Sequence, residues 1–160
     1  MFRFNFSASN SCILLTSGFF LIYASVALSH TGATGIVKQR MDSMKEMKSA
    51  MKSMAGLVKG EMPFDSERAY ASLLTVERHA HKLLDYFPDT EESRTGSETE
   101  ALAGIWATWD DFAFLAESLA RDTGNLKQAG ISGIDELTLR NGLKQITATC
   151  KNCHDDYRKP

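Results

Sequence analysis

Residues 135–158, DELTLRNGLKQITATCKNCHDDYR, contain the pattern that decides the fold. Positions at successive steps of four, three, four and four are occupied by Leu139, Leu143, Ile146, Cys150 and His154. This spacing places the five side chains on one face of an α-helix that starts near Asp135. An apolar helix face is the one that packs against the rest of a protein. We therefore expect the cysteine and the histidine to lie on the buried side of the last helix.

The three residues Cys150, Cys153 and His154 form the CxxCH pattern of a c-type haem attachment site. On a helix, residues i and i+3 share a face, so both thiols can reach the two vinyl groups of one porphyrin. The adjacent histidine can then supply its imidazole to the iron as the proximal ligand. The motif predicts one haem c, bound covalently through two thioethers.

Other interpretations of the motif remain open at this point. A structural zinc ion needs a fourth ligand, and the only other histidines are His30, His79 and His81. Residues two apart do not share a helix face, so we expect His79 and His81 to be separate surface or partly buried side chains. A thiol–disulfide motif usually accompanies a βαβ pattern, and no strand pattern is found. Chance is the remaining alternative.

The composition narrows the class of protein. A length of 160 residues suits one domain, and 43% hydrophobic with 24% charged residues is ordinary for a globular chain. The formal net charge of −2 and the lack of a long basic run argue against nucleic-acid binding. No nucleophile–base pair, phosphate loop or carboxylate pair forms a familiar motif, so no enzymatic activity is expected.

The first 29 residues differ from the rest. Arg3 precedes an apolar stretch over residues 12–28, and Ala27-Leu28-Ser29 gives the small-residue ending of a secretory signal peptide. We expect export to the periplasm and a mature chain that begins near His30. Because the apolar stretch is long for a signal, an uncleaved membrane anchor is the alternative. Cleavage would remove Arg3 and leave 17 of the 18 basic residues against 20 acidic ones.

Helical periodicity recurs through the rest of the chain. It predicts four helices, over residues 34–59, 66–84, 98–122 and from 135 onward. Asp65 or Ser66 can cap the second helix, and Ser97 with Glu100 has the pattern of a capping box for the third. The short connections favour antiparallel neighbours. We therefore expect an all-α domain over residues 30–160, an antiparallel up-down-up-down four-helix bundle with the haem in its core.

Four segments carry a family resemblance: RMDSMK at 40–45, KGEMPFD at 59–65, IWATWDDF at 105–112 and CKNCHDDYR at 150–158. On these segments the chain resembles the class II c-type cytochromes, the cytochrome c-prime family, over nearly all of residues 34–160. The most specific feature is the position of the haem motif at the C-terminus. The resemblance implies a four-helix bundle, the fold that the periodicity also predicts.

The resemblance also implies a set of site residues. Cys150 and Cys153 match the cysteines that bind the haem, and His154 matches the proximal ligand. Arg40 matches an arginine that lies near a haem propionate. Met44, one turn later, matches the residue that faces the other side of the iron.

Family members show two behaviours. In one, a methionine of the first helix is the sixth ligand, the iron is low-spin and the protein carries electrons. In the other, an apolar side chain covers a five-coordinate, high-spin iron that binds nitric oxide or carbon monoxide. A thioether suits haem iron, so we expect His/Met ligation and electron transfer, with gas binding or protection as the alternative. Met41 and Met47 are weaker candidates than Met44.

Further expectations concern partner proteins and the electrostatic effect of Arg158 on the iron. Electron transfer implies redox partner proteins, and the resemblance implies a homodimer. Arg158 matches a basic residue near the proximal imidazole. It either tunes the iron or is a solvated charge that suits the C-terminal end of a helix.

Overall fold

The structure is a computed structural model, and it describes residues 32–160. The helices of these residues are α1 (Gly35–Val58), α2 (Ser66–Ala80), η1 (Leu84–Tyr86), α3 (Glu91–Thr95), α4 (Gly104–Ala107), α5 (Trp109–Lys127), α6 (Gly130–Gly133) and α7 (Glu136–Tyr157). Among the residues from 32 to 160, no helix is both long and apolar enough to cross a membrane. The expected signal peptide or anchor, residues 1–29, and the expected start of the domain at residue 30 lie outside the described residues.

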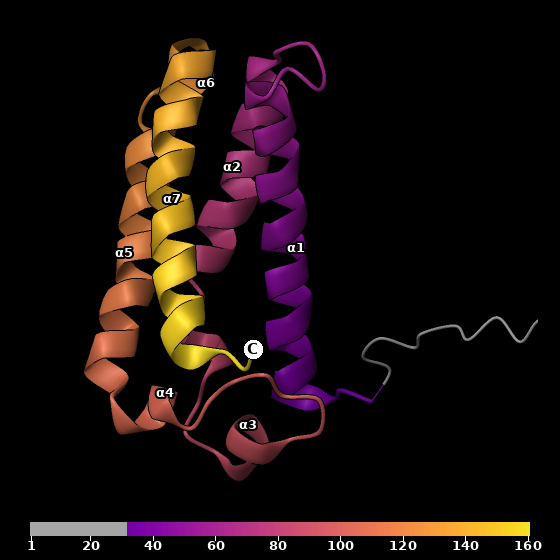
Figure 1. The fold of residues 1–160 in the computed structure, drawn as a ribbon, viewed down its shortest axis with the longest axis vertical. Helices are drawn as coiled ribbons and strands as arrows, with labels where there is room; N and C mark the ends of the chain where they lie inside the picture. The colour runs from indigo at the N-terminus through magenta and orange to yellow at the C-terminus, as the bar shows by residue number, and fades with distance from the viewer. Residues whose placement is uncertain (1–31) are drawn as a thin grey trace, which may run out of the picture.

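The four long helices, α1, α2, α5 and α7, run side by side and alternate in direction (Figure 1). The short helices α3 and α4 lie at the end where α1 begins and α7 ends, and α6 lies at the opposite end. This arrangement confirms the predicted up-down-up-down four-helix bundle. It brings the first half of α1 to the same end of the bundle as the last half of α7.

Side-chain caps fix where two of the long helices begin. The Asp65 carboxylate accepts a hydrogen bond from the backbone N–H of Arg68 at 2.9 Å, and Asp135 accepts one from Thr138 at 2.7 Å. Such caps satisfy backbone donors that the helix itself leaves unpaired. The predicted starts of α2 and α7 are therefore confirmed.

The predicted start of the third helix is wrong. Glu98 has a φ of 66°, a value that non-glycine residues rarely adopt. The backbone near it pairs with the end of the chain instead. Leu102 donates its N–H to the Tyr157 carbonyl at 2.9 Å, and the Lys159 N–H donates to the Glu100 carbonyl at 2.8 Å. These tertiary hydrogen bonds replace the capping box that the local sequence favours.

Other boundaries also differ from the prediction. After the break, helical structure resumes in α4 and α5, and α5 continues to Lys127, beyond the expected end at residue 122. The second helix ends at Ala80, four residues before the expected end at residue 84, and η1 follows it. The connection between the second and third predicted helices, residues 85–97, contains α3, whose first turn is capped by the Thr90 side chain.

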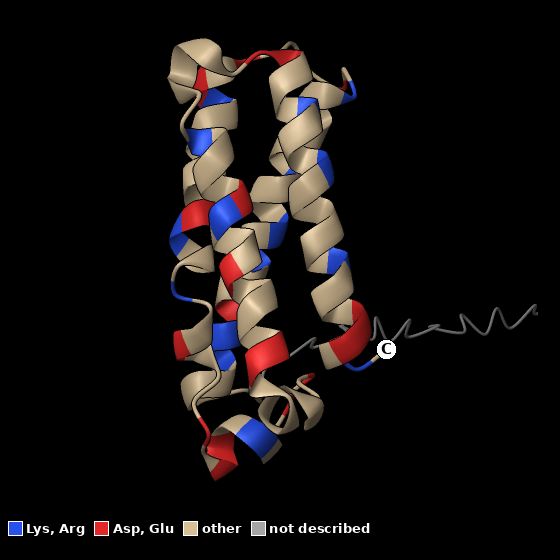
Figure 2. Ribbon diagram, turned by 90° about the vertical axis from the view of Figure 1, so that its left-hand side faces the viewer, with Lys and Arg blue, Asp and Glu red and all other residues tan. Residues whose placement is uncertain are grey.

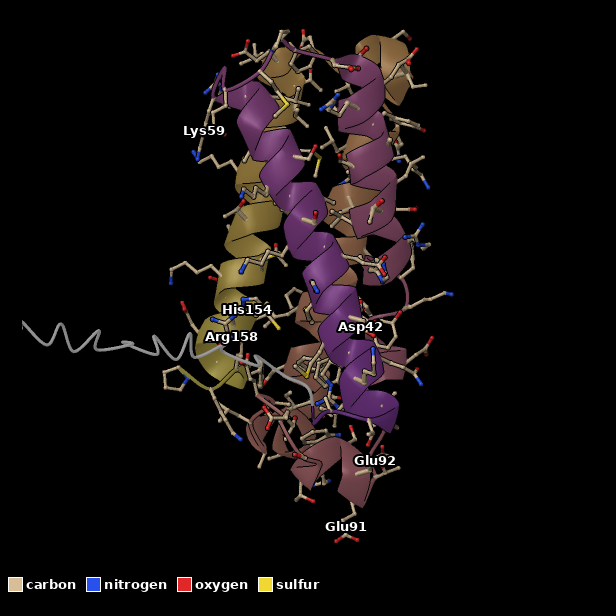
Figure 3. The ribbon with its side chains drawn as sticks, turned by 90° about the vertical axis from the view of Figure 1, so that its right-hand side faces the viewer. Asp42, Lys59, Glu91, Glu92, His154 and Arg158 are labelled. Atoms are coloured by element: carbon tan, nitrogen blue, oxygen red, sulfur yellow. The ribbon has the colours of Figure 1, made fainter. Side chains whose placement is uncertain are left out.

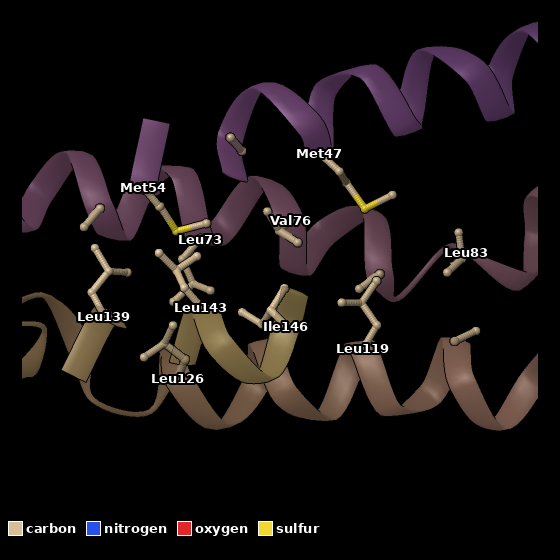
Figure 4. Packing of buried hydrophobic residues seen from close by; sticks show 14 of the residues in the cluster. Met47, Met54, Leu73, Val76, Leu83, Leu119, Leu126, Leu139, Leu143 and Ile146 are labelled. Atoms are coloured by element: carbon tan, nitrogen blue, oxygen red, sulfur yellow. The ribbon is translucent and has the colours of Figure 1, made fainter. Parts of the chain in front are cut away.

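The core lies between the four long helices (Figure 4). Its labelled members are Met47, Met54, Leu73, Val76, Leu83, Leu119, Leu126, Leu139, Leu143 and Ile146. Full burial of a large apolar side chain stabilises a fold by about 1.5–3 kcal/mol, so these contacts hold the helices together. Leu74 of α2 lies outside this core and is exposed.

Candidate haem site

Helix α7 positions the two cysteines of the motif. Leu139 and Ile146 are fully buried on its inner face, and this anchors the helix in the core. Further along the same helix, Cys150 and Cys153 are partly buried and pack against the core cluster. Both are free cysteines. Two unpaired thiols on an apolar surface are the arrangement that two thioether bonds to one porphyrin require.

The cysteines lack the electrostatics of a redox thiol pair. Burial raises the pKa of Cys150, with a further contribution from Asp122. Burial also raises the pKa of Cys153 to about 11, with a smaller contribution from Cys150. Reactive thiol–disulfide cysteines have a lowered pKa, because the thiolate is the reactive form. The surroundings of these thiols therefore argue against the thiol–disulfide interpretation.

The zinc interpretation lacks ligands near the motif. Within residues 32–160 there is no group of three or more His, Cys, Asp or Glu side chains that could hold a metal ion. His79 of α2 and His81 at its end contact other residues. His79 is buried, which is more than expected, and contacts Ser43 and Glu46. His81 is exposed and lies 3.3 Å from Glu77.

The imidazole of His154 is in a state that suits iron binding. It is partly buried, and within residues 32–160 its ring forms no hydrogen bond or ion pair. Burial lowers the pKa of His154, and the positive charge of Arg158 lowers it further. The neutral imidazole that results is the form that ligates metals. Arg158 itself is exposed, and its tuning of the iron stays a prediction.

Arg40 is buried near the start of α1, with 6% of its surface exposed. Its Nε donates to the Tyr86 carbonyl at 3.1 Å. Its two terminal nitrogens donate to the carbonyl and hydroxyl of Ser93 and to the Thr99 hydroxyl, at 2.6–3.3 Å. The guanidinium also lies 4.2 Å from the centre of the Phe87 ring. Arg40 therefore ties α1 to the segment that closes this end of the bundle.

All of these acceptors are neutral, so the charge of Arg40 has no carboxylate partner among residues 32–160. Burial lowers its pKa to about 10, which leaves it positively charged at neutral pH. A buried charge without an opposite charge is costly. A haem propionate would supply the missing negative charge, so the surroundings of Arg40 fit the expected cofactor.

Met44 follows Arg40 by one turn of α1, is partly buried and packs against the core cluster. Its height in the bundle follows from a contact between α1 and α7. The Arg140 guanidinium donates to the carbonyl of Val58 at 2.9 Å. Arg140 to His154 and Val58 back to Met44 are both fourteen residues. Because antiparallel helices rise equally, about 1.5 Å per residue, Met44 and His154 lie within about one turn of the same height.

The views of the molecule agree with this register. Figure 3 shows His154 and Arg158 at the same end of the bundle as Asp42, which lies between Arg40 and Met44 in the sequence. The structure thus brings the predicted site residues of α1 and α7 to one region. Of the weaker methionine candidates, Met47 is buried in the core and Met41 is partly buried.

Several contacts around the site were not predicted. They include the Ser93 and Thr99 acceptors of Arg40 and the Ser43–His79 pair beside Met44. No local motif marks these residues, because each contact joins segments at least 36 residues apart. The spacing of the histidines predicted only that they point in different directions, as they do.

Comparison with known proteins identifies the family. Residues 35–158 match the family model described as Cytochrome C′. The chain is 36% identical over 129 residues to cytochrome c′ of Rhodopseudomonas palustris. The alignment covers 78% of this chain and 82% of that protein. It is 34% identical over 124 residues to cytochrome c-556 of Agrobacterium tumefaciens, which covers 78% of this chain and 97% of the relative.

Solved structures show the same fold. Cytochrome c′ from Rhodopseudomonas palustris aligns with a TM-score of 0.71 and 32% identity over 80% of this chain and 98% of that one. A nitric oxide complex of a variant of cytochrome c prime from Alcaligenes xylosoxidans aligns with a TM-score of 0.68 and 26% identity, over 78% and 94% of the two chains. The chain belongs to the cytochrome c′ family, the c-type cytochromes whose four-helix bundle carries one covalently attached haem c.

Proposed function

We propose that this protein carries single electrons through its haem c, with His154 and Met44 as the axial ligands. The observation that carries the proposal is that these two residues lie on neighbouring helices within about one turn of the same height, as the Arg140–Val58 contact indicates. Cytochrome c′ family proteins carry electrons or bind gases and are not typical enzymes, so the proposal concerns which of these two roles applies.

Each residue has a separate task in this proposal. The thiols of Cys150 and Cys153 would hold the porphyrin on α7, and the imidazole of His154 would bind the iron. The thioether of Met44 is a soft ligand that favours reduced iron. The positive charge of Arg40 offsets a propionate and favours the state with one more electron. The bound haem c supplies the one-electron redox chemistry.

The setting of this activity is also proposed. The signal-like sequence before His30 supports export to the periplasm, where redox partner proteins would meet the cytochrome. A homodimer is proposed from the family resemblance alone.

One observation favours the second role. Structures similar to this chain include nitric oxide complexes of cytochrome c prime from Alcaligenes xylosoxidans. A methionine side chain is flexible, so Met44 could cover the distal face of the iron without binding it. The protein would then bind nitric oxide or carbon monoxide at a five-coordinate haem.

The absorption spectrum of the reduced holoprotein, with and without carbon monoxide, separates the two roles. We expect a low-spin spectrum that carbon monoxide leaves nearly unchanged at neutral pH. A high-spin reduced spectrum that shifts at once with carbon monoxide would overturn Met44 ligation and establish gas binding. Heating the sample until the bundle opens supplies the positive control, because the exposed haem must then bind the gas.

A further inference from the structure

Helices α1 and α7 share a surface that is rich in exposed basic side chains, here named the basic face. Its members are Lys45, Lys48 and Lys52 of α1 with Lys144, Lys151 and Arg158 at α7, and all six are exposed. On α1 the members are three and four residues apart, and on α7 Lys144 and Lys151 are seven residues, or about two turns, apart, so each set follows one stripe. Arg158 directly follows the last residue of α7. Figure 2 shows blue bands along α7, the helix that leads to the terminus marked C, with red at its last turn, whereas α5, nearest the viewer, carries both red and blue bands.

Contacts with the neighbouring helices show that the two stripes lie on the same side. The opposite flank of α1 meets α2, because Ser53 bonds to Ser72 at 3.2 Å. The opposite flank of α7 meets α5, because Thr149 donates to Asp122 at 2.8 Å. The remaining flanks face each other across the seam where α1 contacts α7. The lysines line this seam.

The charges of the basic face are largely uncompensated. Within residues 32–160 the ammonium groups of Lys45, Lys48, Lys52 and Lys144 form no ion pair, whereas Lys151 pairs with Asp155. The face thus has six basic residues and one acidic residue. The rest of the described chain has eleven basic and nineteen acidic residues. A protein that is negative as a whole therefore has one strongly positive side.

This side is also the side of the haem site. Lys45 directly follows Met44, and Lys151 lies between the two cysteines of the motif. Arg158 follows His154 by four residues, and the two lie at the same end of the bundle (Figure 3). A charged partner attracted to the basic face would therefore come close to the cofactor, which is where an electron must leave the protein.

We propose that the basic face docks the acidic surface of a redox partner protein and guides it to the haem. This inference rests on the proposed electron-carrier function. Surface charges of this kind contribute little binding energy each, but together they steer the approach of an opposite charge and raise the rate of association. A second copy of this chain is a poor occupant, because like charges on the two faces would repel.

A small anionic oxidant tests the field at this face. In the transfer, one electron leaves the reduced haem iron, which becomes iron(III), and reduces the iron(III) of hexacyanoferrate to iron(II). We expect the second-order rate constant, measured by stopped flow on the holoprotein, to fall by roughly threefold or more between low salt and about 0.5 M salt, because salt screens attraction. The cationic oxidant tris(phenanthroline)cobalt(III) should show the opposite trend. If overall charge governed the encounter, hexacyanoferrate would react faster at high salt, and that result would overturn the proposal.

Two matched double variants locate the effect. Lys48→Gln/Lys144→Gln removes two charges from the basic face, and Lys82→Gln/Arg121→Gln removes two exposed charges elsewhere. At low salt we expect the first to slow the reaction with hexacyanoferrate by roughly threefold and the second to leave it nearly unchanged. Equal effects of the two variants would refute the basic face. A carbon monoxide spectrum of each sample tests Met44 ligation separately from docking at the basic face. A five-coordinate iron would refute Met44 ligation, and the salt dependence would still test the basic face.

Discussion

The hydroxyl of Ser43 lies 2.9 Å from Nδ1 of His79, and this contact joins α1 to α2 at the residue before Met44. Both residues are buried. The other ring nitrogen, Nε2, lies 2.9 Å from the Glu46 carboxylate, so the imidazole is held from both sides by residues of α1. A ring that donates from Nε2 to Glu46 accepts the Ser43 proton at Nδ1. The turn of α1 that contains Met44 is thereby fixed against α2.

His79→Ala is expected to loosen this turn. The buried Ser43 hydroxyl would lose its partner, which costs about 1–3 kcal/mol of unfolding free energy. Met44 would be held less firmly, so the reduced protein should bind carbon monoxide more readily. Denaturant unfolding and carbon monoxide titration measure the two effects. His81→Ala, at an exposed position, is the control, and equal behaviour of the two variants would count against the positioning role.

Met44→Ala should convert the haem from low-spin to high-spin and open it to carbon monoxide. Met47→Ala is a demanding control, because Met47 is buried in the core and its loss should cost about 2–5 kcal/mol of stability without changing the spectrum. Met41→Ala should also leave the spectrum nearly unchanged. A spectrum that changes in the Met41 or Met47 variant, and not in the Met44 variant, would move the ligand to that residue.

Arg40 has a charge and a set of hydrogen bonds, and two substitutions separate them. Arg40→Leu should lower both the unfolding free energy and the midpoint potential, the latter by tens of millivolts, where about 59 mV corresponds to 1.4 kcal/mol for one electron. Arg40→Lys should lose the paired contacts with Ser93 and so lose stability, yet retain most of the potential. A redox titration showing equal potentials in the wild-type and Leu variants would rule out an electrostatic role. Arg94→Gln, at an exposed site on α3, is the control.

Replacing both Cys150 and Cys153 with Ala should abolish covalent haem retention. After extraction with acidified organic solvent, a denaturing gel stained for haem should show colour at the wild-type polypeptide and none at the double variant. Each single variant should retain haem through one thioether. Colour that leaves the wild-type chain during extraction would contradict covalent attachment.

The Glu77 carboxylate links α2 to the end of α5. It pairs with Lys127 and lies 3.3 Å from His81, and the hydrogen bond from Lys127 is the main reason why the pKa of Glu77 falls below its ordinary value of 4.5. A lowered pKa in the folded state means that the carboxylate stabilises the fold above pH 4.5. This contribution is lost as the pH falls through the folded-state pKa.

Glu77→Gln should therefore lower the unfolding free energy at neutral pH and make little difference in strong acid. Denaturant unfolding between pH 7 and pH 3 provides the measurement, with exposed Glu117→Gln as the control. A gap between wild type and Glu77→Gln that widens as the pH falls would contradict the assignment.

The last helix illustrates what local sequence can predict. Its cap at Asp135, its apolar spacing and its CxxCH motif all lie within one continuous stretch. The structure confirms the cap and the burial of Leu139, Leu143 and Ile146. The break before α5 could not be predicted, because Glu100 and Leu102 pair with the chain terminus. The neutral acceptors of Arg40 could not be predicted either, because they lie at least 46 residues away in the sequence and no local motif marks them. From the sequence, Met44 was chosen as the sixth ligand by family resemblance alone. Without the resemblance, the several methionines of α1 would be equal candidates for that ligand.

The adjacency of α1 and α7 has a consequence for how the chain could be rewired. Both ends of the described chain lie at one end of the bundle (Figure 1), the condition under which circular permutation is tolerated. A linker from Pro160 to Gly35, with a cut between Gly60 and Pro63, would keep every helix whole and make α1 the last to be synthesised. The haem motif would then be complete before Met44 exists, so cofactor attachment and closure of the distal face could be observed as separate events in time.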